Sequence, residues 1–379
     1  MRPSNEAMNL DRLPTPHLVL DVEVMEANIA TAFALAGAAG VALRPHAKSH
    51  KCAQIAEALA GAGAIGACVA TLAEAEALAA AGVRGLLLTA PFGSDEQVAR
   101  VAALHAGGAD LMVVADHPNV VARLDRAVAA SGGGALTVLV DCDPGMGRTG
   151  VADAGAAVAL AAAIGGAQAL RFGGVQFYYG NLQHIRDYDS RRSEVTAQAD
   201  TLRGIVAALE QAGTPAAIVT GGGTGTLGID LGLGVFTELQ PGSFLFMDSD
   251  YAPVEVTGGN GDGGAGNPFA QSLWVRATVV SVGPRRATVN AGIKALATDS
   301  GLPQAAAGAP EGTTYRFTGD EHGRLDLPEG AGLAPGDMVE LVPSHCDPTV
   351  NLHAGYAVRR AGRIEGWWPV VGRYGAGPG

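Results

Sequence analysis

The chain has 379 residues, 48% of them hydrophobic, and a formal net charge of −12. This length suits one large domain followed by a smaller one. The acidic balance argues against nucleic acid or an anionic membrane surface as a partner, because both favour a basic face, so small molecules are the expected ligands. The N-terminal stretch lacks the apolar core of a signal peptide, and the longest apolar run is short of a bilayer span, so we expect a cytoplasmic location.

Eight short β-rich runs alternate with longer Ala/Leu-rich stretches of helical period between residues 15 and 255. The runs are residues 41–45, 67–71, 86–90, 111–115, 136–141, 174–178, 216–222 and 235–239. Repeated β–α units are typical of an α/β fold with a parallel sheet, and eight of them favour a closed (β/α)8 barrel of the TIM type. An open doubly wound sheet is the alternative, although no G-x-G-x-x-G follows the first run to open a helix.

A Gly/Asn/Asp-rich stretch at residues 257–268 is typical of a loop or domain boundary. Beyond it, apolar and polar residues alternate between turn signals, which is the pattern of antiparallel strands. We therefore predict a barrel over residues 15–255 and a mostly antiparallel β domain over residues 256–379, with residues 1–14 packing on the second domain.

Polar and glycine-rich residues follow the predicted barrel strands, where a barrel gathers side chains around one pocket. Lys48 follows the first strand, Arg148 the fifth, and Tyr178 and His184 the sixth. The turns TGGGTGT (220–226) and QPGS (240–243) follow the seventh and eighth. This arrangement predicts a site at the carboxyl ends of the strands.

Lys48 lies in RPHAKSHK (44–51), which holds two of the three lysines of the chain. A strand-end lysine is ordinarily only solvated, but its scarcity here favours a specific use. Near Arg44 and His46, a desolvated lysine is expected to have a lowered pKa and to form a Schiff base with a carbonyl, as pyridoxal phosphate requires.

The turn TGGGTGT offers unobstructed backbone N–H groups and hydroxyls that suit a phosphate monoester. It lacks the G-K-[ST] ending of a Walker loop, and the alternative is an ordinary glycine-rich turn. If this turn lies opposite a Schiff-base lysine, phosphate binding becomes the favoured interpretation.

A second cluster, PSHCDPTVNLH (343–353), contains an H-x-D pair. On a strand, His345 and Asp347 would share a face while Cys346 points away. An N,O pair suits Mn²⁺, Mg²⁺, Co²⁺ or a catalytic Zn²⁺. The alternative is that His345 caps a turn and Asp347 begins a bend.

These motifs together resemble the D-threonine aldolase and D-serine dehydratase family of pyridoxal phosphate enzymes, over nearly the whole chain. The resemblance implies an alanine racemase-type barrel followed by a β domain, and a homodimer. It places the Schiff base on Lys48 rather than Lys51 and the metal on His345 and Asp347. Around the cofactor it implies Arg148, Tyr178, His184, Gly223, Thr224, Gln240, Gly242 and Ser243.

Two stretches depart from the pattern of the aldolases: ACVATLAEAEAL (67–78), and Tyr179, where histidine is common. We expect both to reshape the substrate pocket. By resemblance, Gln240 replaces an arginine that faces the pyridine nitrogen, and we expect this neutral partner to leave that nitrogen unprotonated.

The resemblance implies retro-aldol cleavage of a D-β-hydroxy-α-amino acid to glycine and an aldehyde, with His184 or a metal-bound water as general base. The alternative is β-elimination by a D-serine or 3-hydroxyaspartate dehydratase to a 2-oxo acid and ammonia. A non-catalytic pyridoxal phosphate carrier and an amino-acid racemase are weaker alternatives. Neither needs a metal, so replacing His345 with alanine separates both from a metal-dependent lyase.

Overall fold

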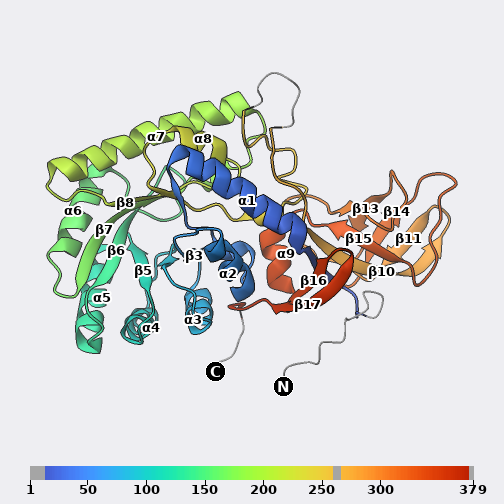
Figure 1. Cartoon of the computed structure of the whole chain (residues 1–379), viewed down its shortest axis with the longest axis horizontal. Helices are drawn as coiled ribbons and strands as arrows, with labels where there is room; N and C mark the ends of the chain where they lie inside the picture. The colour runs from blue at the N-terminus through green and yellow to red at the C-terminus, as the bar shows by residue number, and fades with distance from the viewer. Residues whose placement is uncertain (1–12, 259–265, 375–379) are drawn as a thin grey trace.

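The computed structural model describes residues 13–258 and 266–374 (Figure 1). All eight predicted barrel strands are present: β2 (Ala42–Leu43), β3 (Ala67–Val69), β4 (Leu86–Leu88), β5 (Leu111–Ala115), β6 (Leu136–Cys142), β7 (Leu170–Phe177), β8 (Ile218–Gly221) and β9 (Glu238–Leu239). They form one parallel sheet in the order β2-β9-β8-β7-β6-β5-β4-β3.

The first and last strands of this order meet, which makes the sheet a barrel. A parallel bridge joins His46, just after β2, to Cys68 of β3, and Cys68 N donates a hydrogen bond to Pro45 O at 2.9 Å. The predicted (β/α)8 class is therefore confirmed, and the open doubly wound alternative is wrong.

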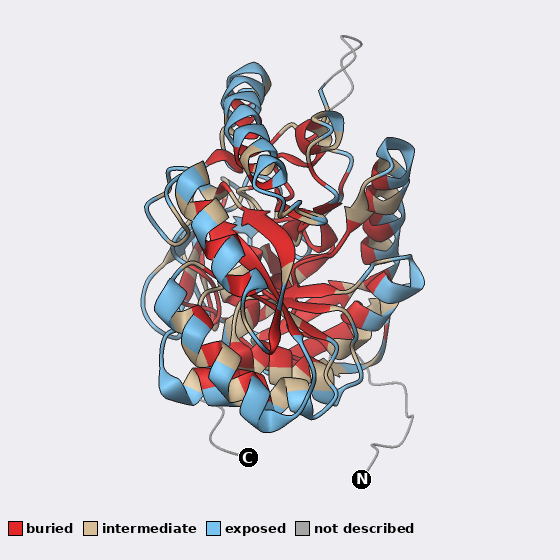
Figure 2. Ribbon diagram, turned by 90° about the vertical axis from the view of Figure 1, so that its left-hand side faces the viewer, coloured by how far each residue is buried: buried red, intermediate tan, exposed pale blue. Residues whose placement is uncertain are grey.

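The helices surround the strands and turn their exposed faces outward (Figure 2). They are α1 (Val22–Ala39), α2 (Ala53–Gly61), α3 (Leu72–Ala80), α4 (Asp95–Ala106), α5 (Pro118–Ser131), α6 (Ala154–Gly165), α7 (Tyr188–Gln211) and α8 (Leu227–Gly232). Local sequence explains their starts: Ser94 forms a capping box with Gln97, and Asp153 and Asp187 accept hydrogen bonds from the first turns of α6 and α7.

Helix α1 has 18 residues and a mean hydropathy of 1.2, so by length and composition alone it could cross a membrane, as the core helix of a soluble protein also could. It is the one such helix among the described residues. Here Met25, Ile29, Ala32 and Ala36 form a buried stripe at helical spacing, and α1 packs against α8 and the short helix at Ser243–Leu245.

The second sheet has nine strands: β1 (His17–Asp21), β10 (Leu273–Gly283), β11 (Arg286–Val289), β12 (Gln304–Ala305), β13 (Thr314–Phe317), β14 (Gly323–Asp326), β15 (Met338–Val342), β16 (Gly355–Arg360) and β17 (Arg363–Pro369). Its pairs are antiparallel except for β1 with β16, so the predicted mostly antiparallel class is confirmed.

Strand β1 pairs with β10 and β16, so residues 17–21, inside the segment predicted as barrel, contribute to the second sheet. Of the predicted N-terminal packing segment 1–14, residues 1–12 lie outside the described residues, as do residues 259–265 of the predicted boundary loop. Between β15 and β16 the chain forms α9 (Cys346–Leu352), which lies against the barrel segment Ala47–Ser49 (Figure 1).

Candidate active site

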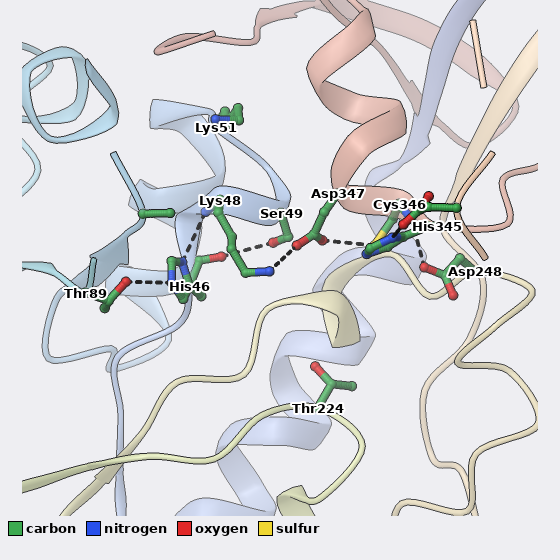
Figure 3. Close-up of polar contacts among 12 residues, drawn as sticks. His46, Lys48, Ser49, Lys51, Thr89, Thr224, Asp248, His345, Cys346 and Asp347 are labelled. Atoms are coloured by element: carbon green, nitrogen blue, oxygen red, sulfur yellow. Dashed lines mark hydrogen bonds and ion pairs between the residues drawn. The ribbon is translucent and has the colours of Figure 1, made fainter. Parts of the chain in front are cut away.

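Lys48 and the H-x-D cluster meet, although 299 positions separate them in the chain. Lys48 lies in a short 3-10 turn (Ala47–Ser49) after β2, and the ring of His46 accepts a hydrogen bond from Lys48 N at 3.3 Å. The Lys48 ammonium pairs with Asp347 of α9 at 2.7 Å (Figure 3). The contact between the barrel and the second domain thus places the predicted cofactor lysine beside the predicted metal ligand.

The predicted lowering of the Lys48 pKa is wrong. Asp347 raises the pKa of Lys48, because the carboxylate stabilises the ammonium form. Neither basic neighbour opposes this effect strongly: the Arg44 guanidinium is held by both oxygens of Glu238 at 2.8 and 2.9 Å. Burial lowers the pKa of His46 well below its usual range, so that ring is neutral.

The H-x-D pair lies at a helix start, not on the predicted strand. His345 is the N-cap residue of α9 and Asp347 lies in its first turn, so α-helical geometry, not strand alternation, sets their directions. Cys346 is fully buried, and its backbone N donates to Asp248 Oδ2 at 2.8 Å. Burial raises the pKa of Asp347, but the Lys48 ammonium and His345 outweigh it, so this pKa falls to about 2.

The donor set at the H-x-D pair fits a divalent metal. His345 Nδ1 lies 2.6 Å from Asp299 Oδ2, a pairing that leaves Nε2 as the ligand atom and fixes the ring. Asp347 supplies carboxylate oxygens, which hard divalent cations prefer. The described residues contain no group of three or more His, Cys, Asp or Glu side chains arranged for a metal. A metal bound by only His345 and Asp347 would keep positions open for water and substrate.

A cavity of about 300 Å³ opens beside Lys48 at the carboxyl ends of the strands. It brings together four of the predicted residues, Lys48, Arg148, Tyr178 and Gln240. The other lining residues are His46, Ala70, Thr89, Ala90, Pro91, Thr149 and Gln176. A larger hollow of about 630 Å³, lined by Gly66, Gly85 and Asp110 among others, precedes β3, β4 and β5 at the opposite end of the barrel. Barrel enzymes use the carboxyl end, so the smaller cavity is the candidate active site.

The aromatic ring of Tyr178 and the guanidinium of Arg148 form one wall of this cavity, with the Arg148 carbon 5.3 Å from the ring centroid. Gln176 is a site residue that the sequence reasoning missed. It lies near the end of β7, two positions before Tyr178, and this i, i+2 spacing was the available signal.

Gln240 has its amide group fixed by protein partners. Its Nε2 donates to Thr220 Oγ1 at 2.9 Å and to Gln176 Oε1 at 3.3 Å. Gln176 in turn donates to Asp141 Oδ1 at 2.8 Å. With both N–H groups engaged, Gln240 offers Oε1, an acceptor, to any further partner.

The two predicted phosphate turns lie side by side, because Phe244 N donates to Thr224 Oγ1 at 3.1 Å. A Cβ atom at Gly242 would lie 3.1 Å from His46 O and 3.2 Å from Ser49 Oγ, so this turn packs closely against the Lys48 segment. Among the described residues, no protein acceptor binds the backbone N–H of Thr224 or Ser243. These free donors fit the phosphate of a cofactor bound at Lys48.

His184 does not line the cavity. Its Nδ1 lies 2.9 Å from Asp250 Oδ2, and its ring packs on Tyr251 with centroids 4.6 Å apart. Its side chain is 38% exposed. Asp250 fixes the imidazole outside the cavity lining, and the role of His184 as general base stays a prediction.

Tyr179 does not shape the substrate pocket, so that prediction is wrong. Its side chain is buried and packs edge-on against Phe177 and Phe236, and its hydroxyl donates a hydrogen bond to Asp230. Tyr178 lines the cavity, whereas Tyr179 is directed away from it toward Asp230. In the other departing stretch, Ala70 does line the cavity.

The fold is a (β/α)8 barrel whose cavity at the carboxyl ends of the strands holds Lys48, and comparisons with known proteins assign it to a family. Residues 20–250 match the alanine racemase N-terminal domain, and residues 272–359 match the putative serine dehydratase domain. The chain therefore belongs to the D-threonine aldolase and D-serine dehydratase family, whose alanine racemase-type fold implies pyridoxal phosphate.

Two relatives and one solved structure illustrate this membership. The chain is 38% identical to D-threonine aldolase of Arthrobacter sp. over 375 residues, covering 98% of this chain and 96% of that protein. It is 35% identical to 3-hydroxy-D-aspartate aldolase of Paracoccus denitrificans (strain Pd 1222), covering 98% and 95%. The crystal structure of D-threonine aldolase from Filomicrobium marinum matches with a TM-score of 0.90 at 36% identity, covering 97% and 98%. These relatives are lyases.

Proposed function

We propose that this protein is a pyridoxal phosphate- and divalent metal-dependent lyase that cleaves a D-β-hydroxy-α-amino acid into glycine and an aldehyde. The observation that carries the proposal is the contact between Lys48 and Asp347 at 2.7 Å. It brings the residue that would attach the cofactor next to one that would hold a metal. A D-threonine-like substrate is supported by two similar proteins named D-threonine aldolase.

When bound, pyridoxal phosphate accepts the electron pair released as a bond to Cα breaks. Lys48 attaches the cofactor, and the donors at Thr224 and Ser243, with the close turns at Gly223 and Gly242, bind its phosphate. Arg148 and Tyr178 line the cavity beside Lys48.

His345 and Asp347 would hold Mn²⁺, Mg²⁺, Co²⁺ or Zn²⁺ at the side of the cavity that faces the second domain. A metal there suits coordination of the substrate β-hydroxyl, which lowers the pKa of that hydroxyl. His184, oriented by Asp250, is the proposed acceptor of its proton. Loss of this proton favours cleavage of Cα–Cβ, because the resulting carbonyl leaves as the aldehyde.

The second candidate is β-elimination to a 2-oxo acid and ammonia. The match of residues 272–359 to a putative serine dehydratase domain favours it. In that reaction Lys48 would take the Cα proton and the β-hydroxyl would leave as hydroxide, and His345 and Asp347 would hold a metal that supplies Lewis-acid chemistry. A carrier or racemase has less support, because neither uses an H-x-D pair. A homodimer in the cytoplasm completes the proposal.

The test is product identification by mass spectrometry after incubation of the purified protein with D-threonine, pyridoxal phosphate and Mn²⁺. We expect glycine and acetaldehyde from D-threonine, none from L-threonine, and loss of product on chelation or in His345→Ala. The formation of 2-oxobutanoate and ammonia would instead establish the dehydratase. Activity that survives both chelation and His345→Ala would contradict metal dependence.

A further inference from the structure

A buried polar cluster lies behind the glycine-rich turn and plays no part in the proposed reaction. It consists of Tyr179 and Gln183, which follow β7, and Thr226 and Asp230, at the start of α8 and within it. Tyr179 is 1% exposed and the other three side chains are 0% exposed. Such groups are costly to bury unless their hydrogen bonds are made, so their partners show what the cluster does.

The Thr226 hydroxyl is the centre of the cluster. It donates to Asp230 Oδ2 at 2.6 Å and accepts from Gln183 Nε2 at 3.0 Å and from Gly223 N at 3.3 Å. A hydroxyl has one hydrogen and two lone pairs, so this group is saturated. The Tyr179 hydroxyl donates to the other oxygen, Asp230 Oδ1.

The cluster binds the backbone of the turn at alternate positions. Gly223 N is directed to Thr226, and Gly225 N donates to Gln183 Oε1 at 3.0 Å. Between them, the N–H of Thr224 has no protein acceptor among the described residues. The cluster therefore determines which amide of the turn is available to an anion.

Two glycines of the turn, Gly222 and Gly223, lie against side chains of this cluster. A Cβ at Gly222, where φ is +64°, would lie 2.4 Å from Asp230 Oδ2. A Cβ at Gly223 would lie 2.5 Å from Gln183 Oε1. The side chains behind the turn thus press directly on its backbone, and only glycine fits.

We propose that Tyr179, Gln183, Thr226 and Asp230 are positioning residues that hold the 220–226 turn in its phosphate-binding shape. This inference rests on the proposed function, since it takes pyridoxal phosphate as the ligand. It assigns the cluster to retention of the phosphate group, and not to the attachment of the aldehyde at Lys48 or to the chemical step.

The test compares two ligands that differ only in the phosphate, pyridoxal phosphate and pyridoxal, each titrated into the apoprotein and followed by the visible absorbance of the bound aldehyde. Thr226→Val removes the central hydroxyl, and Thr226→Ser is the matched control that keeps it. We expect Thr226→Val to weaken binding of pyridoxal phosphate about tenfold and to leave pyridoxal binding unchanged. Thr226→Ser should keep the wild-type preference for the phosphorylated ligand.

Tyr179→Phe is a milder second variant that removes one hydroxyl and keeps the ring packing, with an expected weakening of about threefold for pyridoxal phosphate alone. Equal affinity of wild type and Thr226→Val for pyridoxal phosphate would overturn the inference. So would equal losses for both ligands, which indicate general damage. If the wild type binds neither ligand, the proposed function itself fails.

Discussion

Lys48 and Lys51 lie three positions apart in one segment, yet the fold gives them opposite environments. The Lys48 side chain is 41% exposed and pairs with Asp347, which is 12% exposed, beside the cavity. The Lys51 side chain is 7% exposed and pairs with Glu74, which is 1% exposed. Figure 3 shows Lys51 lying apart from the Lys48–Asp347 pair.

The backbone explains the separation. Lys51 has φ of 47°, in the left-handed region that few non-glycine residues adopt, and this turns its side chain away from that of Lys48. Lys51 O also accepts a hydrogen bond from Val371 N at 2.7 Å. This backbone hydrogen bond connects the C-terminal segment to the barrel. The comparison shows that the residues of a partly exposed ion pair, such as Lys48 and Asp347, can separate to bind a ligand. A buried pair, such as Lys51 and Glu74, contributes to stability instead.

The largest expected effect is on activity, from Lys48→Ala. We expect a loss of roughly a thousandfold or more, because the amine proposed to attach the cofactor is gone. The midpoint of thermal unfolding of the apoprotein should change little, since the lost pair is partly exposed. Rate assays and thermal unfolding measure the two effects. An active Lys48→Ala would remove the distinction between the two lysines.

The second prediction concerns the proposed metal ligands His345 and Asp347, the second of which pairs with Lys48. Asp299→Ala removes the carboxylate that orients His345, and we expect the Mn²⁺ concentration for half-maximal activity to rise about tenfold. His345→Ala should lose metal-dependent activity entirely while the visible absorbance of bound cofactor remains. A metal titration of each variant checks both effects. Unchanged Mn²⁺ dependence in both variants would argue against a metal at this position.

The third prediction tests the buried Lys51–Glu74 pair. Lys51→Met leaves Glu74 buried without its cation, and we expect the free energy of unfolding to fall by about 3 kcal/mol. The double variant Lys51→Met with Glu74→Leu should recover part of this loss, because no charge is left uncompensated. Urea unfolding of the apoproteins measures these differences. A double variant no more stable than the single one would show that the charge is not the cause.

The smallest expected effect concerns Asp141, a buried carboxyl group that has no ion pair among the described residues. It can be compared with the two carboxylates that pair with Lys48 and Lys51. Burial raises the pKa of Asp141 to about 6, against hydrogen bonds from Gln176 and Thr149. The folded state therefore holds this proton more tightly than the unfolded state does. Its contribution to stability is present below pH about 4 and is lost as pH rises through 6.

Asp141→Asn removes this titration. Urea unfolding at several pH values should show that the stability of the wild type relative to Asp141→Asn falls by about 2 kcal/mol or less between pH 4 and 7. A difference that stays constant over this range would contradict the raised pKa.

The sequence by itself determined the eight barrel strands, because apolar periodicity and turn residues are local signals. It also indicated Lys48, the glycine-rich turn and the H-x-D pair, since their residue types are unusual for their places. Arg148, Tyr178 and Gln240 follow from the same rule that reactive groups gather at the carboxyl ends of barrel strands, and the structure does bring them together.

Only the tertiary structure decided the rest. The pKa of Lys48 depends on Asp347, a partner 299 positions away that no local pattern reveals. The H-x-D segment begins a helix that packs against the Lys48 segment. Tyr179 is directed to Asp230, away from the cavity. Electrostatics and side-chain direction depend on neighbours brought together by folding, whereas element type depends on residues close in sequence.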